Sequence, residues 1–425
     1  MESNSKLESF IDRKTRRKKK KKGMKVLRLP VFVAFARNTF GLSVARWLKA
    51  EPEDRSIFKR IKPPFFLMST HNSFWGPFVL AALVPYQVSY VVNDANFRSP
   101  LMKLGLALTG AIPKTKALSD FDTIKSIFDI RKQGGVIGIY PEGQNSYDGH
   151  TIPIFASTAK LVKRMKIPVI IGDKRGSYLT FPRWAKNVRK GKILISYREE
   201  FSPEELETMS VEEIYERMKQ DYTYNEFDFQ RKAMIPYKGK DKAEYLEIVL
   251  FVCPHCKSVA KMVSKGDFFT CTECGYEVEY TVYGFFETKG DKLYFDNIRD
   301  WNIWQFEYFF EDLTKRLAEL EEFTIFEDFG MTLSVGYKAD PMEEIGRGDV
   351  TLYSDHLVFL DSDGESLSFS FSEMVGINMH NDEKLEFYFR NSLFRVDSRN
   401  KRISLYKYYR VIQYLQEKKK AAETV

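Results

Sequence analysis

Residues 136–143, Val-Ile-Gly-Ile-Tyr-Pro-Glu-Gly, predict a buried β-strand that ends in a polar turn. The run is short, apolar and rich in β-branched residues, and Pro141 and Gly143 interrupt it. Similar strand-like runs lie at 64–68, 88–92, 167–171 and 192–197, with helical segments at 78–83, 121–132 and 157–166. Strands that alternate with helices predict an α/β domain with a mostly parallel central sheet.

The chain has 425 residues, which favours two or three domains over a single core. Its net charge of +8 is concentrated in residues 13–22, where nine of the ten residues are Lys or Arg. Removing these nine charges from +8 leaves −1 for the remaining chain. We therefore predict that residues 1–23 are a disordered basic arm that binds an anionic membrane face or a nucleic acid, or is simply solvated.

The sequence predicts neither a secretory signal nor a clean membrane span. Residues 25–49 interleave Val, Leu and Phe with Arg and Lys, which suits a helix in the lipid interface or a core helix with charged flanks. The charge-free stretch 63–93 contains Pro77 and Pro85, so we interpret it as strand, turn and helix. We expect a cytoplasmic protein that attaches peripherally to the inner face of the membrane.

All four cysteines lie in two Cys-x-x-Cys pairs, Cys253/Cys256 and Cys271/Cys274, with fourteen residues between the pairs. Two such pairs at this spacing place four thiolates around one Zn²⁺ and predict a zinc ribbon over residues 245–290. Four Cys ligands leave no open coordination position, so the metal is expected to be structural. Two disulfides or a redox pair are the alternatives, which the missing secretion signal disfavours.

The rest of the chain divides into a helical and a β-rich part. Capping boxes begin at Ser202 and Ser210, and residues 210–232 are predicted to form one helix on the sheet. Short β-like runs around an Asp-Gly turn then lead to a helix over 404–416, an arrangement that resembles the pleckstrin-homology-like superfold. The predicted order is an α/β domain over 24–235, the ribbon, and a pleckstrin-homology-like domain over 325–420.

Four blocks of the α/β domain carry candidate chemistry. They are Thr-His-Asn-Ser-Phe-Trp-Gly-Pro (70–77), Gly-Ala-Ile-Pro-Lys-Thr-Lys (110–116), Tyr-Pro-Glu-Gly-Gln-Asn-Ser (140–146) and Ile-Pro-Val-Ile (167–170). In this order and at these separations they resemble the blocks of the glycerolipid acyltransferases of the lysophosphatidic-acid type. The resemblance covers about residues 60–200.

The resemblance implies an O-acyltransferase of phospholipid biosynthesis that works at a membrane surface. His71 would be the general base for an acceptor hydroxyl that attacks the thioester of acyl-CoA or of an acyl-carrier protein. Lys116 would supply a cation for the phosphate of a lysophospholipid-type acceptor. Glu142, Gly143 and Asn145 would shape the acceptor pocket.

Two positions depart from the family pattern. The Asp that orients the imidazole is Gly76 here, and the Arg of the third block is Asn145. In the serine-protease triad, loss of the orienting carboxylate lowers the rate about 10⁴-fold. Either another carboxylate replaces it, with Asp94 and Asp148 as candidates, or the protein is a degenerate member of the fold that binds lipid and turns over weakly or not at all.

Two further alternatives remain. His150 is a candidate for a displaced base. A basic arm beside a zinc ribbon also suits a nucleic-acid binder, but the ribbon holds one more acidic than basic residue, and the four blocks would be unexplained. We therefore expect no specific nucleic-acid partner.

Overall fold

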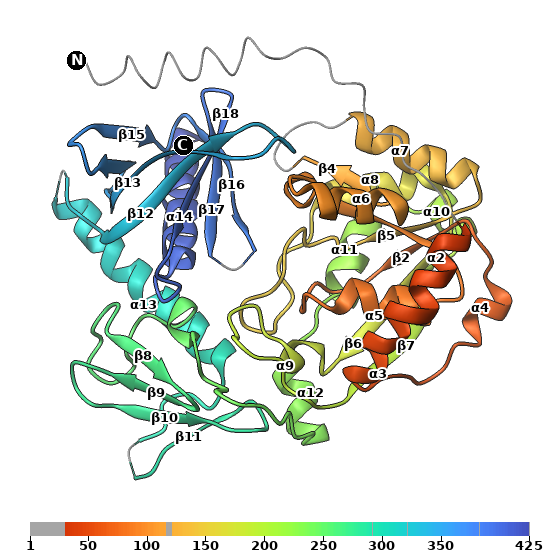
Figure 1. The fold of residues 1–425 in the computed structure, drawn as a ribbon, viewed down its shortest axis with the longest axis horizontal. Coiled ribbons are helices and arrows are strands. Elements are labelled where there is room, and N and C mark those ends of the chain that lie inside the picture. Colours follow the sequence, from red (N-terminus) through yellow and green to blue (C-terminus); the bar gives the residue numbers. More distant parts are fainter. Residues whose placement is uncertain (1–29, 116–120, 291, 321, 382, 425) are drawn as a thin grey trace.

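The structure is a computed structural model that describes residues 30–115, 121–290, 292–320, 322–381 and 383–424. The predicted basic arm and Lys116 lie outside these residues. The described chain contains three sheets, of seven, four and seven strands. Figure 1 shows the first sheet with its helices on one side of the molecule and the two later sheets on the other, joined by the long helix α13.

The first sheet is mostly parallel, as predicted, and only the β6–β7 pair is antiparallel. In spatial order its strands are β1 (Ala50–Pro52), β7 (Ile193–Phe201), β6 (Val169–Arg175), β2 (Phe65–Met68), β5 (Val136–Ile139), β3 (Val88–Asn93) and β4 (Ile112–Lys114). Its helices are α2 (Pro30–Ala36), η1 (Arg37–Gly41), α3 (Leu42–Trp47), α4 (Ile57–Arg60), α5 (Gly76–Leu83), η2 (Asp94–Phe97), α6 (Pro100–Leu108), α7 (Phe121–Lys132), α8 (Ala156–Met165), α9 (Ser177–Thr180), α10 (Pro203–Thr208), α11 (Val211–Asp221) and α12 (Glu226–Ala233).

Hydrophobic cores form on both faces of this sheet. Phe66 and Met68 of β2 pack with α7, α8 and α11, whereas Phe65 and Leu67 pack with α3, α4 and α5. Alternate residues of a strand point to opposite faces, so a strand covered on both sides is apolar at every position. This double burial explains the unbroken apolar runs of the sequence.

Residues 25–49 and 210–232 were each predicted as one helix, and the structure differs from that prediction in both segments. The described part of 25–49 is helical but contains the π-helical turn η1. Residues 210–232 form α11 and α12 instead of the one helix predicted. The main chain of Tyr224 leaves the helical path to pair with Thr151, and the Asn225 side chain then caps α12 by accepting from the Phe227 N–H at 3.1 Å.

The second sheet contains β8 (Met262–Lys265), β9 (Phe268–Cys271), β10 (Glu277–Tyr280) and β11 (Phe286–Glu287), all antiparallel, after the short η3 (Leu246–Ile248). Helix α13 (Ile298–Glu319) follows and was not predicted. The Asn297 side chain caps it by accepting from the Asp300 N–H at 3.0 Å. Its buried residues include Trp301 and Phe309, which belong to one core with the second and third sheets.

The third sheet is antiparallel throughout, in the order β15 (Ser366–Ser370), β14 (His356–Asp361), β13 (Glu343–Leu352), β12 (Phe326–Gly336), β18 (Ser392–Ser398), β17 (Lys384–Phe389) and β16 (Met374–His380). Helix α14 (Leu405–Thr424) lies against it (Figure 1). The predicted Asp-Gly turn is present, with Gly364 at φ 83°. None of the helices in the described parts of the chain combines the length and apolar character needed to cross a bilayer.

Candidate active site and metal centre

Two of the predicted blocks, 70–77 and 140–146, meet at the carboxyl-end edge of the first sheet, whereas the block 167–170 lies at the amino end of β6. His71 follows β2, the turn at 140–143 follows β5, and Lys174 lies near the end of β6. These three strands are neighbours and parallel, so their carboxyl ends lie side by side. In open α/β sheets this is the edge where ligands bind.

Glu142 connects the two central blocks. Its carboxylate accepts a hydrogen bond from the main-chain N–H of His71 through Oε2, and one from the Ile152 N–H at 3.3 Å through Oε1. The main-chain oxygen of His71 accepts in turn from the Ser146 N–H at 2.8 Å. Burial raises the pKa of Glu142 to about 8, against the lowering effects of the His71 N–H and of the Lys174 charge. The carboxylate thus fixes the turn that carries the imidazole.

The imidazole of His71 is half-buried against a tyrosine. Its centroid lies 4.4 Å from that of the Tyr140 ring, at an interplanar angle of 30°. Tyr140 in turn stacks on Tyr90 of β3, with centroids 5.8 Å apart. These rings support one face of the imidazole and restrict its rotation.

A lysine side chain fills the position where the orienting carboxylate is missing. A Cβ atom placed on Gly76 would lie 2.9 Å from Cε and 3.6 Å from Nζ of Lys174. Gly172, two residues earlier on β6, faces Leu80, one helical turn further along α5. The same face of β6 therefore runs beneath α5, and a side chain at position 76 shares its space with Lys174.

Lys174 is only 2% exposed. Its ammonium group donates to Ser69 Oγ and, at 2.8 Å, to the main-chain oxygen of Thr70, the two residues before His71. It also lies 5.1 Å from the centre of the Tyr140 ring. Burial lowers the pKa of Lys174 to about 7, although the Glu142 charge opposes the shift. A lysine amine, with a pKa near neutrality, thus stands where the family pattern has a carboxylate.

The other candidate residues have partners of their own, and Asp148 accepts from Ser146 Oγ at 3.1 Å. Asp94 accepts from Thr115 Oγ at 2.8 Å, and Asp148 accepts from the Asn302 amide at 2.8 Å. His150 pairs through its main chain with Asn225, and burial, then the charge of Arg299, lowers its pKa. The hydrogen bonds of Asp94 and Asp148 therefore join the loops of this edge to their surroundings.

The remaining candidate residues, Gly143 and Asn145, lie in the turn after β5. Gly143 has φ 70°, a conformation that favours glycine. A Cβ atom on it would lie 2.7 Å from the Phe155 ring. The main-chain oxygen of Asn145 accepts from Arg183 at 2.9 Å.

An aromatic patch adjoins the His71 turn. We define it as Phe40, Trp47, Phe74, Trp75 and Phe78. The rings pair at centroid distances of 6.1 Å (Phe40–Phe78), 5.8 Å (Phe74–Phe78) and 5.7 Å (Trp47–Trp75). Phe40 and Phe74 remain 55% and 51% exposed. The sequence placed lipid-facing residues in 25–49 but gave no sign that they join the histidine turn in space.

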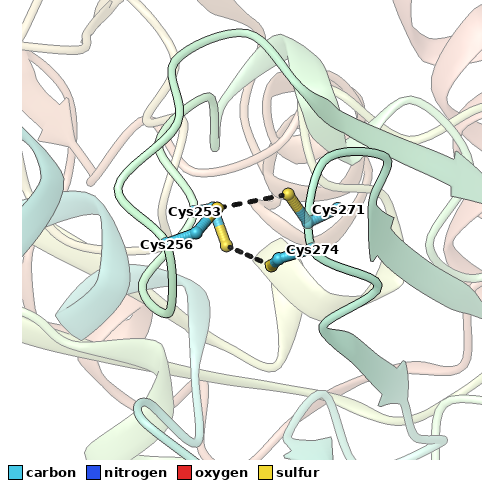
Figure 2. A group of neighbouring side chains, drawn as sticks. All are labelled: Cys253, Cys256, Cys271 and Cys274. Carbon is cyan, nitrogen blue, oxygen red and sulfur yellow. Dashed lines mark hydrogen bonds between the residues drawn. The ribbon is translucent and has the colours of Figure 1, made fainter.

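The four cysteines come together, as Figure 2 shows. Their Sγ atoms lie within 4.8 Å of one another, with Cys253 and Cys274 at 3.8 Å and Cys256 and Cys271 at 3.7 Å. A tetrahedral Zn–S₄ centre with bonds of about 2.3 Å has S···S separations of about 3.8 Å. The four cysteines are free thiols in the structure. The donor set and its spacing therefore fit a tetrahedral metal ion.

Part of the first sheet's domain is similar to a known protein family. Residues 50–170 match the family model described as Acyltransferase. This part of the chain is therefore similar to the acyltransferase family. The matched residues include His71, Gly76, Glu142, Gly143 and Asn145, whereas Lys174 lies just beyond them.

The solved structures that are similar to parts of the chain include the following two. One is the crystal structure of the 1-acyl-sn-glycerophosphate (LPA) acyltransferase PlsC from Thermotoga maritima, at 15% identity and a TM-score of 0.40 over 47% of this chain and 79% of that one. The other is the Vps36 N-terminal PH domain, at 17% identity and a TM-score of 0.20 over 23% of this chain and 81% of that one. No curated protein matches the chain.

Proposed function

We propose that this protein is a membrane-surface O-acyltransferase of phospholipid biosynthesis. It transfers a fatty acyl group from a thioester donor, acyl-CoA or an acyl-carrier protein, to the hydroxyl of a lysophospholipid-type acceptor. The observation that carries the proposal is the union of two blocks of the matched residues 50–170, in which Glu142 binds the main chain of His71.

In this proposal the imidazole of His71 takes the proton of the acceptor hydroxyl as its oxygen attacks the thioester carbon. The new C–O bond forms, the C–S bond breaks, and the leaving thiolate takes the proton from the imidazolium. Lys116 binds the acceptor phosphate, and Glu142, Gly143 and Asn145 form the wall beside it. Glu142 also positions His71 through the main-chain hydrogen bond.

The aromatic patch supports a membrane-bound acceptor. Val31 and Phe35 of α2, at 85% and 66% exposure, extend the apolar surface beyond Phe40. Large exposed apolar surfaces mark interaction sites, and aromatic residues beside a basic segment suit the headgroup region of an anionic bilayer. We propose that this surface and the basic arm attach the protein peripherally to the cytoplasmic face of the membrane.

Lys174 favours a second candidate function, a catalytically weak or inactive lipid-binding member of the same fold. The carboxylate of comparable dyads accepts the imidazole N–H and stabilises the imidazolium with its negative charge. Lys174 supplies no negative charge in either form, and its ammonium form cannot accept a hydrogen bond. The space that a carboxylate would need is taken by the lysine side chain. Acceptor binding without turnover would then be the outcome.

One assay separates these candidates. Purified protein is incubated with labelled acyl-CoA and lysophosphatidic acid in liposomes, beside His71→Ala and, as a matched control, His150→Ala. We expect product from the wild type and from His150→Ala, and none from His71→Ala. Equal background in all three proteins, with retained binding of the acceptor, identifies the non-catalytic member instead.

We further propose that the four cysteines hold one structural Zn²⁺, which would cross-link the two turns of the ribbon, and that residues 325–420 are a pleckstrin-homology-like domain. A meander of antiparallel strands followed by α14 supports the second proposal. The ion's role is to tie the ribbon together, since four thiolates leave no position for a substrate.

A further inference from the structure

We propose that the third sheet and α13 hold the loop 144–148 in place and that Arg183 is a positioning residue for the acyl transfer proposed above. The catalytic part of this inference rests on the proposed function. Its structural part, the grip on the loop, rests on contacts alone.

Arg183 joins the loop to the third sheet. Its side chain is 7% exposed as a residue and donates from Nη1 to the Asn145 main-chain oxygen at 2.9 Å and from Nε to that of Asn381 at 3.0 Å. The guanidinium also lies 4.1 Å from the centre of the Tyr147 ring. The flat, multiply donating guanidinium allows one side chain to bind both partners at fixed geometry.

Further contacts hold the same loop from the other side. Gln144 donates to the Tyr409 hydroxyl of α14 at 2.9 Å. The ring of Tyr147 stacks on that of Tyr406 with centroids 4.1 Å apart. Asp148, as noted, accepts from Asn302 of α13. The loop thus contacts both helices that carry the third sheet's core.

Ser146 is the loop residue whose main-chain N–H binds the His71 turn. Its N–H donates to the main-chain oxygen of His71, while its neighbours on both sides bind Arg183, α13 and α14. The loop is therefore a direct link from the third sheet to the His71 turn. A shift of that sheet moves the partner of the histidine main chain.

A second set of contacts, which we call the Arg98–Glu386 seam, joins the third sheet to the segment that binds the block 110–116. Arg98, just after η2, forms an ion pair with Glu386 of β17 at 2.5 Å and donates to the Lys338 main-chain oxygen at 3.1 Å. Asp94, in the same segment, binds Thr115 at the end of the block 110–116. Both blocks assigned to the acceptor are thus braced by the third sheet, so its removal should affect the acceptor more than the donor.

Hydrogen exchange on the full-length protein tests the grip. In Arg183→Met, which keeps most of the side-chain volume, we expect amides 142–148 to exchange at least about tenfold faster, because a charged donor that bound two main-chain oxygens is lost. Arg183→Lys should give a smaller change. The matched control is Arg347→Met, which removes an exposed ion pair with Glu344 and should leave these amides unchanged.

The enzymatic readout separates the two parts of the inference. Arg183→Met should raise KM for the acceptor while KM for acyl-CoA stays unchanged. If amides 142–148 exchange faster in Arg183→Met but the wild type transfers no acyl group, the structural part of the inference stands and the proposed function is rejected. Unchanged exchange at 142–148 in a folded variant overturns the grip. Should Arg183→Met fail to fold, Tyr409→Phe removes only the Gln144 contact and must speed exchange at Gln144 and its neighbours.

Discussion

Gly76→Asp should restore the carboxylate of the family pattern, yet we expect it to raise acyl transfer by less than about tenfold. The reason is the position of Lys174, whose Nζ would lie 3.6 Å from the new Cβ. Two unit charges about 4 Å apart attract each other by about 4 kcal/mol at an effective dielectric constant of about 20. The new carboxylate therefore pairs with the ammonium and not with the imidazole of His71.

The pairing has a stability signature that needs no activity. An opposite charge at this distance raises a lysine pKa by about one to three units. The pKa of Lys174, about 7 in the wild type, should therefore move back toward its usual value. An Asp in the first turn of α5 also interacts favourably with the helix dipole, by about 0.3–1 kcal/mol. These gains oppose a packing cost of about 1–3 kcal/mol, because the new Cβ would lie 2.9 Å from Cε of Lys174 and the lysine must shift. We therefore expect Gly76→Asp to be close to the wild type in stability, as measured by denaturant unfolding.

The double variant Gly76→Asp/Lys174→Met frees the carboxylate. It should gain at least about tenfold more activity than Gly76→Asp, out of the roughly 10⁴-fold that an orienting carboxylate contributes in the serine-protease triad. Lys174→Met alone leaves Ser69 and Thr70 without their donor, and should lose about 1–3 kcal/mol of stability. A single Gly76→Asp variant as active as the double variant would refute this reasoning.

Three further outcomes are expected. Treatment with a chelator should release one Zn²⁺ per chain, as measured by elemental analysis, and should disorder the ribbon because its two turns lose their cross-link. Replacing any one of the four cysteines with serine should also lower the zinc content. Burial alone would raise the pKa of Glu386, but the hydrogen bond and charge of Arg98 and the charge of Arg395 lower it to about 2. The contribution of this ion pair to the free energy of unfolding is therefore fully present above about pH 4.5 and is lost as the pH falls toward 2. In Glu386→Gln the free energy of unfolding should depend less on pH over this range than in the wild type. Phe74→Ser should weaken binding to anionic liposomes about tenfold, given about 1.5–3 kcal/mol for full burial of such a side chain, while Phe329→Ser, at a 63% exposed position on β12, should not.

The sequence predicted those elements whose residue pattern is set by a single local requirement, such as one apolar face or one pair of metal-binding turns. The helix over 121–132 matches α7 because one face is apolar and two glycines follow its end. The cysteine pairs predicted their own cluster because two chelating turns need little else. The mostly parallel sheet followed from apolar runs that are buried on both faces.

The elements that were missed depend on their surroundings. Helix α13 buries residues against both the ribbon and the third sheet, so its aromatic residues follow no single stripe. Strand β16 was not predicted because a register shift between Val375 and Asn378 breaks its alternation. Lys174 gave no signal at all, since only the packing of β6 beneath α5 brings its side chain to Gly76.

The shared core that joins ribbon, α13 and third sheet also takes in Tyr147, Tyr178 and Trp184 of the first part of the chain. On a ribosome these rings emerge long before Tyr406, which covers Tyr147, has been made. At ordinary rates of synthesis the delay is on the order of 10–50 s. The nascent chain thus exposes this apolar surface during that time. Folding of the protein in the cell should therefore depend on chaperones that cover the surface.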